Sequence, residues 1–153
     1  MRLITHRGLT RGPNKNIENN PKTIWDAWTA GFDCEIDLWR IEDRWYLGHD
    51  DPKYLVDDSF LYSGKSWFHC KNREALRYLA SSTNGINYFW HDKDDYTLTS
   101  RGYIWAYPGQ PGGDSTICCL PENVMPVEEI YKLNTYGICS DYVALVKEMK
   151  DLK

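Results

Sequence analysis

The stretch FDCEIDLW, residues 32–39, decides how this chain folds. It is a nearly continuous apolar run, which is typical of a strand that is buried on both faces of a sheet. Two of its three carboxylates, Glu35 and Asp37, lie two residues apart within the run. Because successive side chains on a strand point to opposite faces, both carboxylates are expected on one face of a buried strand.

Short apolar runs on both sides of this stretch alternate with segments of helical periodicity. The run at residues 2–5 precedes a predicted helix over residues 21–31. The run at residues 66–70 precedes a second helix, for which Asn72 is the expected cap. Alternating strands and helices predict an α/β protein with a parallel sheet. The length of the chain predicts that residues 1–153 form a single domain.

The polar residues that follow the strands favour a compact, irregular TIM-type (β/α) barrel. They gather at the carboxyl ends of many different strands, which is where such barrels build their sites. The chain has 153 residues, whereas a regular barrel needs about 250. Its helices are therefore expected to be shortened or missing. An open doubly wound sheet is the alternative architecture.

The composition indicates a globular protein whose partner is a small molecule. Hydrophobic residues make up 42% of the chain, charged residues make up 26%, and the net charge is -4. No stripe of lysine and arginine offsets the acidic residues, so we expect no binding to nucleic acid. No segment has the length of a membrane span or the apolar character of a signal peptide. The five cysteines lack metal-type spacing and predict buried thiols in a reducing, cytoplasmic compartment.

All four histidines of the chain fall at or just past the end of a predicted strand. They are His6, His49, His69 and His91. A single histidine in such a position is usually a hydrogen-bonded strand-end residue. Four of them at one rim indicate a functional site, because imidazole titrates near neutral pH and both donates and accepts protons.

The carboxylates of Glu35 and Asp37 need a positive partner, because like charges this close raise each other's pKa in a buried interior. A divalent cation such as Mg²⁺, Mn²⁺ or Ca²⁺ would provide it, since these ions prefer oxygen ligands. The alternative is a salt bridge from the pair to Arg7 or Lys71, without any metal. Lys71 lies two residues after His69, so these two side chains are expected to share a strand face.

Five motifs, taken in order, resemble those of the glycerophosphodiester phosphodiesterases. They are HRG at residues 6–8, ENNP at 18–21, EID at 35–37, GHDDP at 48–52 and GICSDY at 137–142. That family belongs to the wider phospholipase-C-like phosphodiesterases, and this chain is similar to a short, divergent member. The resemblance implies a (β/α) barrel enzyme that hydrolyses a small phosphodiester such as a glycerophosphodiester.

The same resemblance implies how the phosphodiester would be bound and cleaved. His6 and His49 match the family's acid-base pair. Arg7 would contact the phosphate, and Lys71 resembles the lysine that ends the family's third strand and neutralises phosphate charge.

The resemblance also implies a metal site. Glu35 and Asp37 would hold the ion, together with His69, which stands where the family usually has glutamate. A neutral imidazole removes one negative charge and suits Mn²⁺ or Zn²⁺ better than Ca²⁺. The identity of the ion among Mg²⁺, Mn²⁺ and Ca²⁺ therefore stays open. Glu18 and His91 are expected to support the polar network of the site.

Two functions are compatible with these motifs. The first is metal-assisted hydrolysis of a phosphodiester by a two-histidine acid-base mechanism. The second is a non-catalytic module that binds a phosphate or sugar phosphate on the same fold. The presence of both His6 and His49 favours the enzyme, because a binding module needs no acid-base pair.

Overall fold

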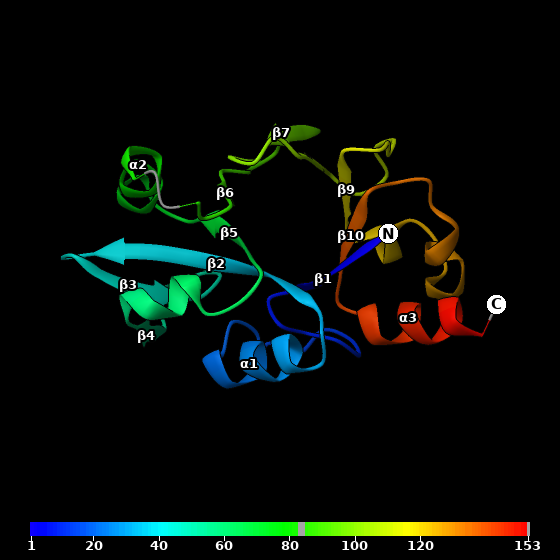
Figure 1. Cartoon of the computed structure of the whole chain (residues 1–153), viewed down its shortest axis with the longest axis horizontal. Coiled ribbons are helices and arrows are strands. Elements are labelled where there is room, and N and C mark those ends of the chain that lie inside the picture. Colours follow the sequence, from blue (N-terminus) through cyan, green and yellow to red (C-terminus); the bar gives the residue numbers. More distant parts are fainter. Residues whose placement is uncertain (83–84, 153) are drawn as a thin grey trace.

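The ten strands found among the described residues belong to one curled, mixed sheet (Figure 1). The computed structural model describes residues 1–82 and 85–152. The strands are β1 (Arg2–His6), β2 (Asp33–Ile41), β3 (Arg44–Leu47), β4 (Tyr54–Val56), β5 (Ser66–Cys70), β6 (Tyr88–Phe89), β7 (Tyr96–Leu98), β8 (Ile104–Ala106), β9 (Thr116–Cys119) and β10 (Gly137–Ser140).

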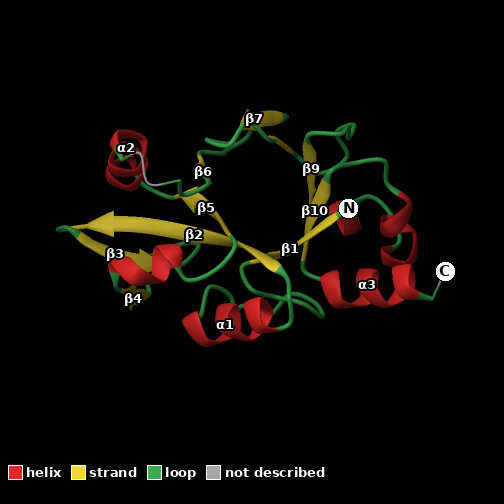
Figure 2. Ribbon diagram, viewed as in Figure 1, coloured by secondary structure: helices red, strands yellow, loops and turns green. Residues whose placement is uncertain are grey.

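Short helices connect some of these strands and lie on the outer side of the curl (Figure 2). The α-helices are α1 (Pro21–Thr29), α2 (Arg73–Ser81) and α3 (Val143–Asp151). The 3-10 segments are η1 (Asp58–Tyr62), η2 (Pro121–Asn123) and η3 (Val127–Lys132). Among the described residues, none of these helices has the length and apolar character that crossing a membrane requires.

Parallel pairing dominates the sheet, with two antiparallel additions. The parallel strands follow the spatial order β6-β5-β2-β1-β10-β9-β8. The far half of β2 continues into an antiparallel ribbon with β3 and β4, which extends away from the other strands in Figure 1. At the other end, β7 pairs antiparallel with β8. The carboxyl ends of the parallel strands consequently lie along one rim.

The prediction of a TIM-type (β/α) barrel is wrong. The structure is a curled half-barrel of mixed strand directions, although it keeps the predicted α/β mixture. A TIM barrel places a helix after each parallel strand, whereas no α-helix follows β6, β8 or β9 in the part of the chain that the structure describes. The links at residues 90–95 and 107–115 are too short for a packed crossover helix, which needs about a dozen residues.

The alternative of a doubly wound sheet is also wrong, because that fold has helices on both faces. Here α1 and α2 contribute Ile24 and Leu79 to one cluster with Ile36 of β2. The helix α3 contributes Val146 to a cluster with Ile138 of β10. Aromatic and aliphatic side chains fill the inner side instead, namely Ile4, Trp67, Phe89, Trp105, Ile117 and Cys139.

The prediction that residues 32–39 contain a buried strand with Glu35 and Asp37 on one face is confirmed. Residues 33–38 of β2 are all buried. Cys34, Ile36 and Leu38 pack in the cluster beneath α1 and α2, while Glu35 and Asp37 face the inner cavity. The alternation of a strand therefore separates the helix-covered face from the face with the carboxylates.

Single hydrogen bonds, rather than a strand ladder, join β6 and the residue after it to β7 and the segment that follows β7. The Ser100 backbone N–H donates to the Tyr88 carbonyl oxygen at 2.8 Å, and the Tyr88 N–H donates to Ser100 Oγ at 3.0 Å. The Thr97 hydroxyl donates to the Trp90 carbonyl oxygen at 2.8 Å. We call these contacts of Tyr88, Trp90, Thr97 and Ser100 the β6 seam.

A buried carboxylate also lies at the opposite end of β2. Asp33 accepts a hydrogen bond from the Trp67 indole N–H at 3.1 Å, and Arg2 Nε lies 3.5 Å from its Oδ2. Burial raises the pKa of Asp33, and the contacts with Trp67 and Arg2 offset this only in part. The charged form of Asp33 is therefore less favourable in the folded protein than in the unfolded chain.

This raised pKa predicts a pH-dependent stability difference between the wild type and Asp33→Asn. A raised folded-state pKa adds stability below the unfolded pKa, and that stability is lost as the pH rises through the folded value. We expect the unfolding free energy of wild type relative to Asp33→Asn to fall as the pH rises above about 4, the value of an unfolded aspartate. Urea unfolding measures it, with the exposed Asp114→Asn as control. A difference that does not change with pH would contradict the prediction.

Candidate functional site

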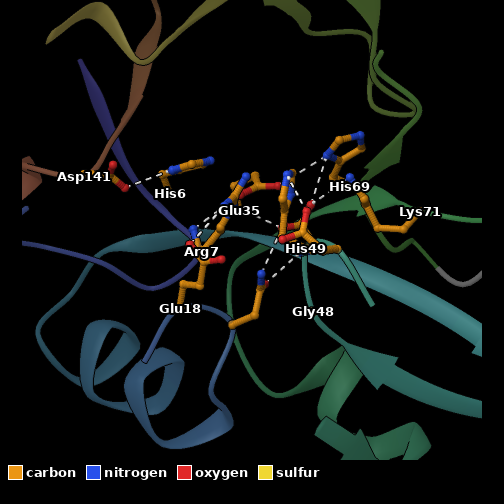
Figure 3. Close-up of polar contacts among 12 residues, drawn as sticks. His6, Arg7, Glu18, Glu35, Gly48, His49, His69, Lys71 and Asp141 are labelled. Carbon is orange, nitrogen blue, oxygen red and sulfur yellow. Dashed lines mark hydrogen bonds and ion pairs between the residues drawn. The ribbon is translucent and has the colours of Figure 1, made fainter. Parts of the chain in front are cut away.

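One cavity of about 490 Å³ lies at the carboxyl ends of the parallel strands. The predicted site residues that line it are His6, Arg7, Glu35, Asp37, His49, His69, Lys71 and His91. In Figure 3, His6 lies on one side of this group, and His69 and Lys71 lie on the other. Residues in or just after β1, β2, β5 and β6 thus border one cavity, whereas no residue of GICSDY at 137–142 lines it.

The Asp37 carboxylate is the most heavily contacted group of the site. Its side chain is 1% exposed. Oδ2 lies 3.1 Å from Arg7 Nε and 3.3 Å from His49 Nδ1. The same oxygen accepts a hydrogen bond from Asn19 Nδ2 at 2.8 Å, and Asn19 Oδ1 accepts one from the Asp37 backbone N–H at 3.0 Å. Three separate segments of the chain therefore converge on Oδ2.

The other oxygen of Asp37 faces β5. The parallel register pairs Asp37 with His69 across the two strands. His69 Nδ1 accordingly lies 3.2 Å from Asp37 Oδ1 and 3.7 Å from Glu35 Oε1. Lys71 Nζ lies 3.7 Å from the same Asp37 oxygen. The prediction that His69 and Lys71 share a face with the two carboxylates is confirmed.

Two contacts fix the orientation of the His69 ring. Its Nε2 donates to the backbone carbonyl oxygen of His91 at 2.9 Å. Its ring stacks on Phe89, with ring centres 5.2 Å apart and 6° between the planes. A carbonyl oxygen only accepts hydrogen bonds, so the proton of neutral His69 sits on Nε2. The Nδ1 lone pair then points toward Glu35 and Asp37, as in a histidine that binds metal.

Glu35, Asp37 and His69 fit a divalent cation. One potential ligand atom from each lies within 4.8 Å of the others. Asp37 Oδ1 is buried and accepts no hydrogen bond in the described structure, which leaves it free to bind an ion. Two carboxylates and one imidazole suit Mg²⁺ or Mn²⁺. The alternative salt bridges are formed in the structure, because Arg7 Nε lies 3.1 Å from Asp37 Oδ2 and Lys71 Nζ lies 3.7 Å from Asp37 Oδ1.

The two buried carboxylates have opposite pKa shifts. Burial, reinforced by the charge of Asp37, holds the pKa of Glu35 well above its usual range. Burial also disfavours the charge of Asp37, but the neighbouring His49 and His69 and the charge of Arg7 outweigh it and hold the pKa of Asp37 well below its usual range. The negative charge of the pair therefore resides on Asp37.

Arg7 lies between three carboxylates at the turn after β1. Its Nη1 donates to Glu18 Oε2 at 2.9 Å, as the proposed polar network requires, and its backbone N–H approaches Glu35 Oε2 at 3.3 Å. Burial lowers the pKa of the Arg7 guanidinium, but Asp37, Glu35 and Glu18 together raise it above its ordinary value. Arg7 has a φ of 56°, a left-handed conformation that costs about 1–2 kcal/mol for a residue with a side chain.

His6 has its own carboxylate partner. Its Nδ1 lies 2.9 Å from Asp141 Oδ1, and both side chains are largely buried. Asp141 follows β10, which pairs in parallel with β1 and so brings the two residues together. A carboxylate on Nδ1 fixes the tautomer of a histidine and leaves Nε2 for proton transfer.

His49 is held by the turn that follows β3. The Trp39 indole N–H donates to the carbonyl oxygen of Gly48 at 2.7 Å. Gly48 has a φ of 152°, and a methyl group on it would overlap the carbonyl oxygen of Asp51. This position therefore requires glycine, and the turn directs His49 Nδ1 toward Asp37.

Asn19 and Asp141 are site residues to which the sequence analysis assigned no role. Both lie inside motifs that it did quote, ENNP and GICSDY. The only signal was their polarity within these motifs, because their partners come from other strands. His91 acts through its backbone, since its carbonyl holds His69 while its ring contacts Asp94 at 3.0 Å.

Comparison with known proteins gave no match to a family model, to a curated protein or to a solved structure. The resemblance to the glycerophosphodiester phosphodiesterases therefore rests on the quoted motifs alone. The function of the site has to be inferred from its geometry.

Substituting the glycine before His49 tests the turn. Gly48→Ala should lower the free energy of unfolding by about 1–3 kcal/mol, because it adds backbone strain and an overlap with Asp51. Gly102→Ala is the matched control, since Gly102 also has a positive φ of 83° but no atom within 4 Å of an added methyl group. It should cost only about 1 kcal/mol. Equal losses in urea unfolding would refute the overlap at Gly48.

Proposed function

We propose that the protein hydrolyses a small phosphodiester, such as a glycerophosphodiester, with a pair of histidines and a divalent cation. One observation carries this proposal. Two histidine-carboxylate pairs, His6 with Asp141 and His49 with Asp37, border one cavity that also contains Arg7. Each histidine contacts its carboxylate through Nδ1 and keeps Nε2 for exchange of protons with a ligand.

The histidines divide the proton transfers between them. One accepts the proton of the attacking group, which is water or a neighbouring hydroxyl of the substrate. As the new P–O bond forms and the bond to the leaving alcohol breaks, the other histidine donates a proton to the departing oxygen. The products after hydrolysis are a phosphomonoester and an alcohol. Asp141 and Asp37 stabilise the imidazolium forms, as carboxylates do in other histidine pairs.

Positive side chains balance the charge of the phosphate. Arg7 and Lys71 both line the cavity and already face carboxylates. Charge that develops on the phosphoryl oxygens during the reaction is stabilised by such fixed cations in a partly dry site. No serine or cysteine nucleophile is needed.

Glu35, Asp37 and His69 would hold the cation. Mg²⁺, Mn²⁺ and Ca²⁺ are the candidates, and the imidazole favours Mn²⁺. Bound there, the ion would act as a Lewis acid on a phosphoryl oxygen. The orientation of His69 toward this position comes from the protein itself, through His91 and Phe89.

A non-catalytic phosphate-binding module is the second candidate function. In such a module Arg7 and Lys71, which line the cavity, would hold the phosphate, and His6 and His49 would transfer no proton. Binding of phosphate without turnover would support this alternative. Hydrolysis would support the enzyme.

Replacing the histidines tests the acid-base pair. With Mn²⁺ and a glycerophosphodiester that has an alkyl leaving group as substrate, His6→Ala and His49→Ala should each lower kcat by about 10²-fold or more, because each removes a proton-transfer group. Phosphorus NMR of the phosphomonoester formed measures the rate. Lys22→Ala, which changes an exposed residue of α1, should retain wild-type turnover. Activity that survives the double change of His6 and His49 would refute the assignment.

Changing the imidazole ligand tests the cation. His69→Glu creates a set of three carboxylates, which should shift the preference from Mn²⁺ toward Mg²⁺ or Ca²⁺. Calorimetry with each ion measures binding, and turnover with each ion measures its use. If His69 instead contacts only the phosphate, the added carboxylate should depress turnover with every ion. Identical ion preferences in wild type and variant would exclude His69 as a ligand.

A further inference from the structure

Asp141 is fixed at three points around its backbone and side chain. Its backbone N–H donates to Glu122 Oε1 at 2.8 Å. Its carbonyl oxygen accepts from the Gly12 N–H, also at 2.8 Å. Its carboxylate contacts His6 Nδ1 at 2.9 Å. The direction of the His6 ring therefore depends on groups that do not touch His6 themselves, and Glu122 is the one that acts through a side chain.

A strained turn brings Glu122 to this position. Leu120, the last residue before η2, has a φ of 44°, although it carries a branched side chain. Its backbone N–H donates to the Cys139 carbonyl oxygen at 2.7 Å, which ties the turn to β10. Non-glycine residues in left-handed conformations persist only where the surroundings enforce them, and they cluster at functional sites.

The Glu122 carboxyl group is itself in an unfavourable environment. It is largely buried, and burial raises its pKa, which its hydrogen bonds offset only in part. Among the described residues, no cationic side chain forms an ion pair with the Glu122 carboxylate. Because the charge of this buried carboxyl group does not stabilise the fold, we expect the group to have a role other than stability.

We infer that Glu122 is a positioning residue for the proposed reaction, because it fixes Asp141 and thereby keeps Nε2 of His6 directed into the cavity. This inference rests on the proposed role of His6 in proton transfer. If Glu122 had only a structural role, it would join the turn after β9 to the end of β10. Its loss would then lower stability without a selective effect on His6.

Kinetic variants separate these roles. Glu122→Ala removes the acceptor for the Asp141 N–H, and we expect kcat on a glycerophosphodiester that has an alkyl leaving group, with Mn²⁺, to fall at least about tenfold while KM changes less than about twofold. Glu122→Asp should behave like Glu122→Ala, because the shorter side chain does not reach Asp141. Glu122→Gln keeps an oxygen acceptor and should restore kcat to within about threefold. Glu128→Ala, an exposed glutamate of η3, is the matched control.

A spectroscopic readout tests the inference without activity. In ¹⁵N-labelled protein, the His6 Nδ1–H proton should be shifted downfield and protected from exchange by Asp141. We expect this resonance in wild type and Glu122→Gln and its loss in Glu122→Ala and Glu122→Asp. Its persistence in folded Glu122→Ala or Glu122→Asp would overturn the inference, as would an unchanged kcat in an active enzyme. Wild-type protein that shows the resonance but no turnover would refute the proposed function and leave the positioning contact established.

Discussion

The buried negative charge of Asp37 is the constraint on which the rest of the site depends. A carboxylate this deep is unfavourable unless it is paired and hydrogen-bonded. Its partners come from the turn after β1, the loop before α1, the turn after β3, and β5. Removing one partner of a buried ion pair costs about 3–5 kcal/mol, because the remaining charge stays uncompensated. Assembly of the site and closure of the sheet around it therefore stabilise each other.

The same constraint gives each carboxylate of the cavity a different chemical character. Asp37 keeps its charge because cationic and N–H groups surround it, whereas burial favours the neutral form of Glu35. Asp141 lies apart from this pair and has His6 as its partner. Two histidines are thus oriented by two independent carboxylates, and the orientation of neither depends on the other. In the proposed reaction, such separation would let one imidazole gain a proton while the other loses one.

The sequence was informative wherever a rule of local geometry applied. The alternation of a strand was enough to place Glu35 and Asp37 on one face, and strand ends were enough to group the histidines. Pairing of Asp37 with His69 depends on the register between β2 and β5, which no local pattern encodes. Asp141 reaches His6 only because β10 lies beside β1. The barrel prediction failed because short apolar runs do not reveal whether the next strand returns through a helix or a hairpin.

The β6 seam has a consequence for access to the cavity. Strand β6 has β5 as its only ladder partner among the described residues, and isolated hydrogen bonds of Ser100 and Thr97 hold its other side. Segments with few ladder bonds separate at a lower free energy than the strands of a continuous sheet. Phe89 and His91, which orient His69, lie on this side. Transient parting of the seam, rather than the resting volume, would then set the largest group that enters, while the ring of His69 would keep its contact with Phe89, because β5 and β6 stay paired on one side of the seam.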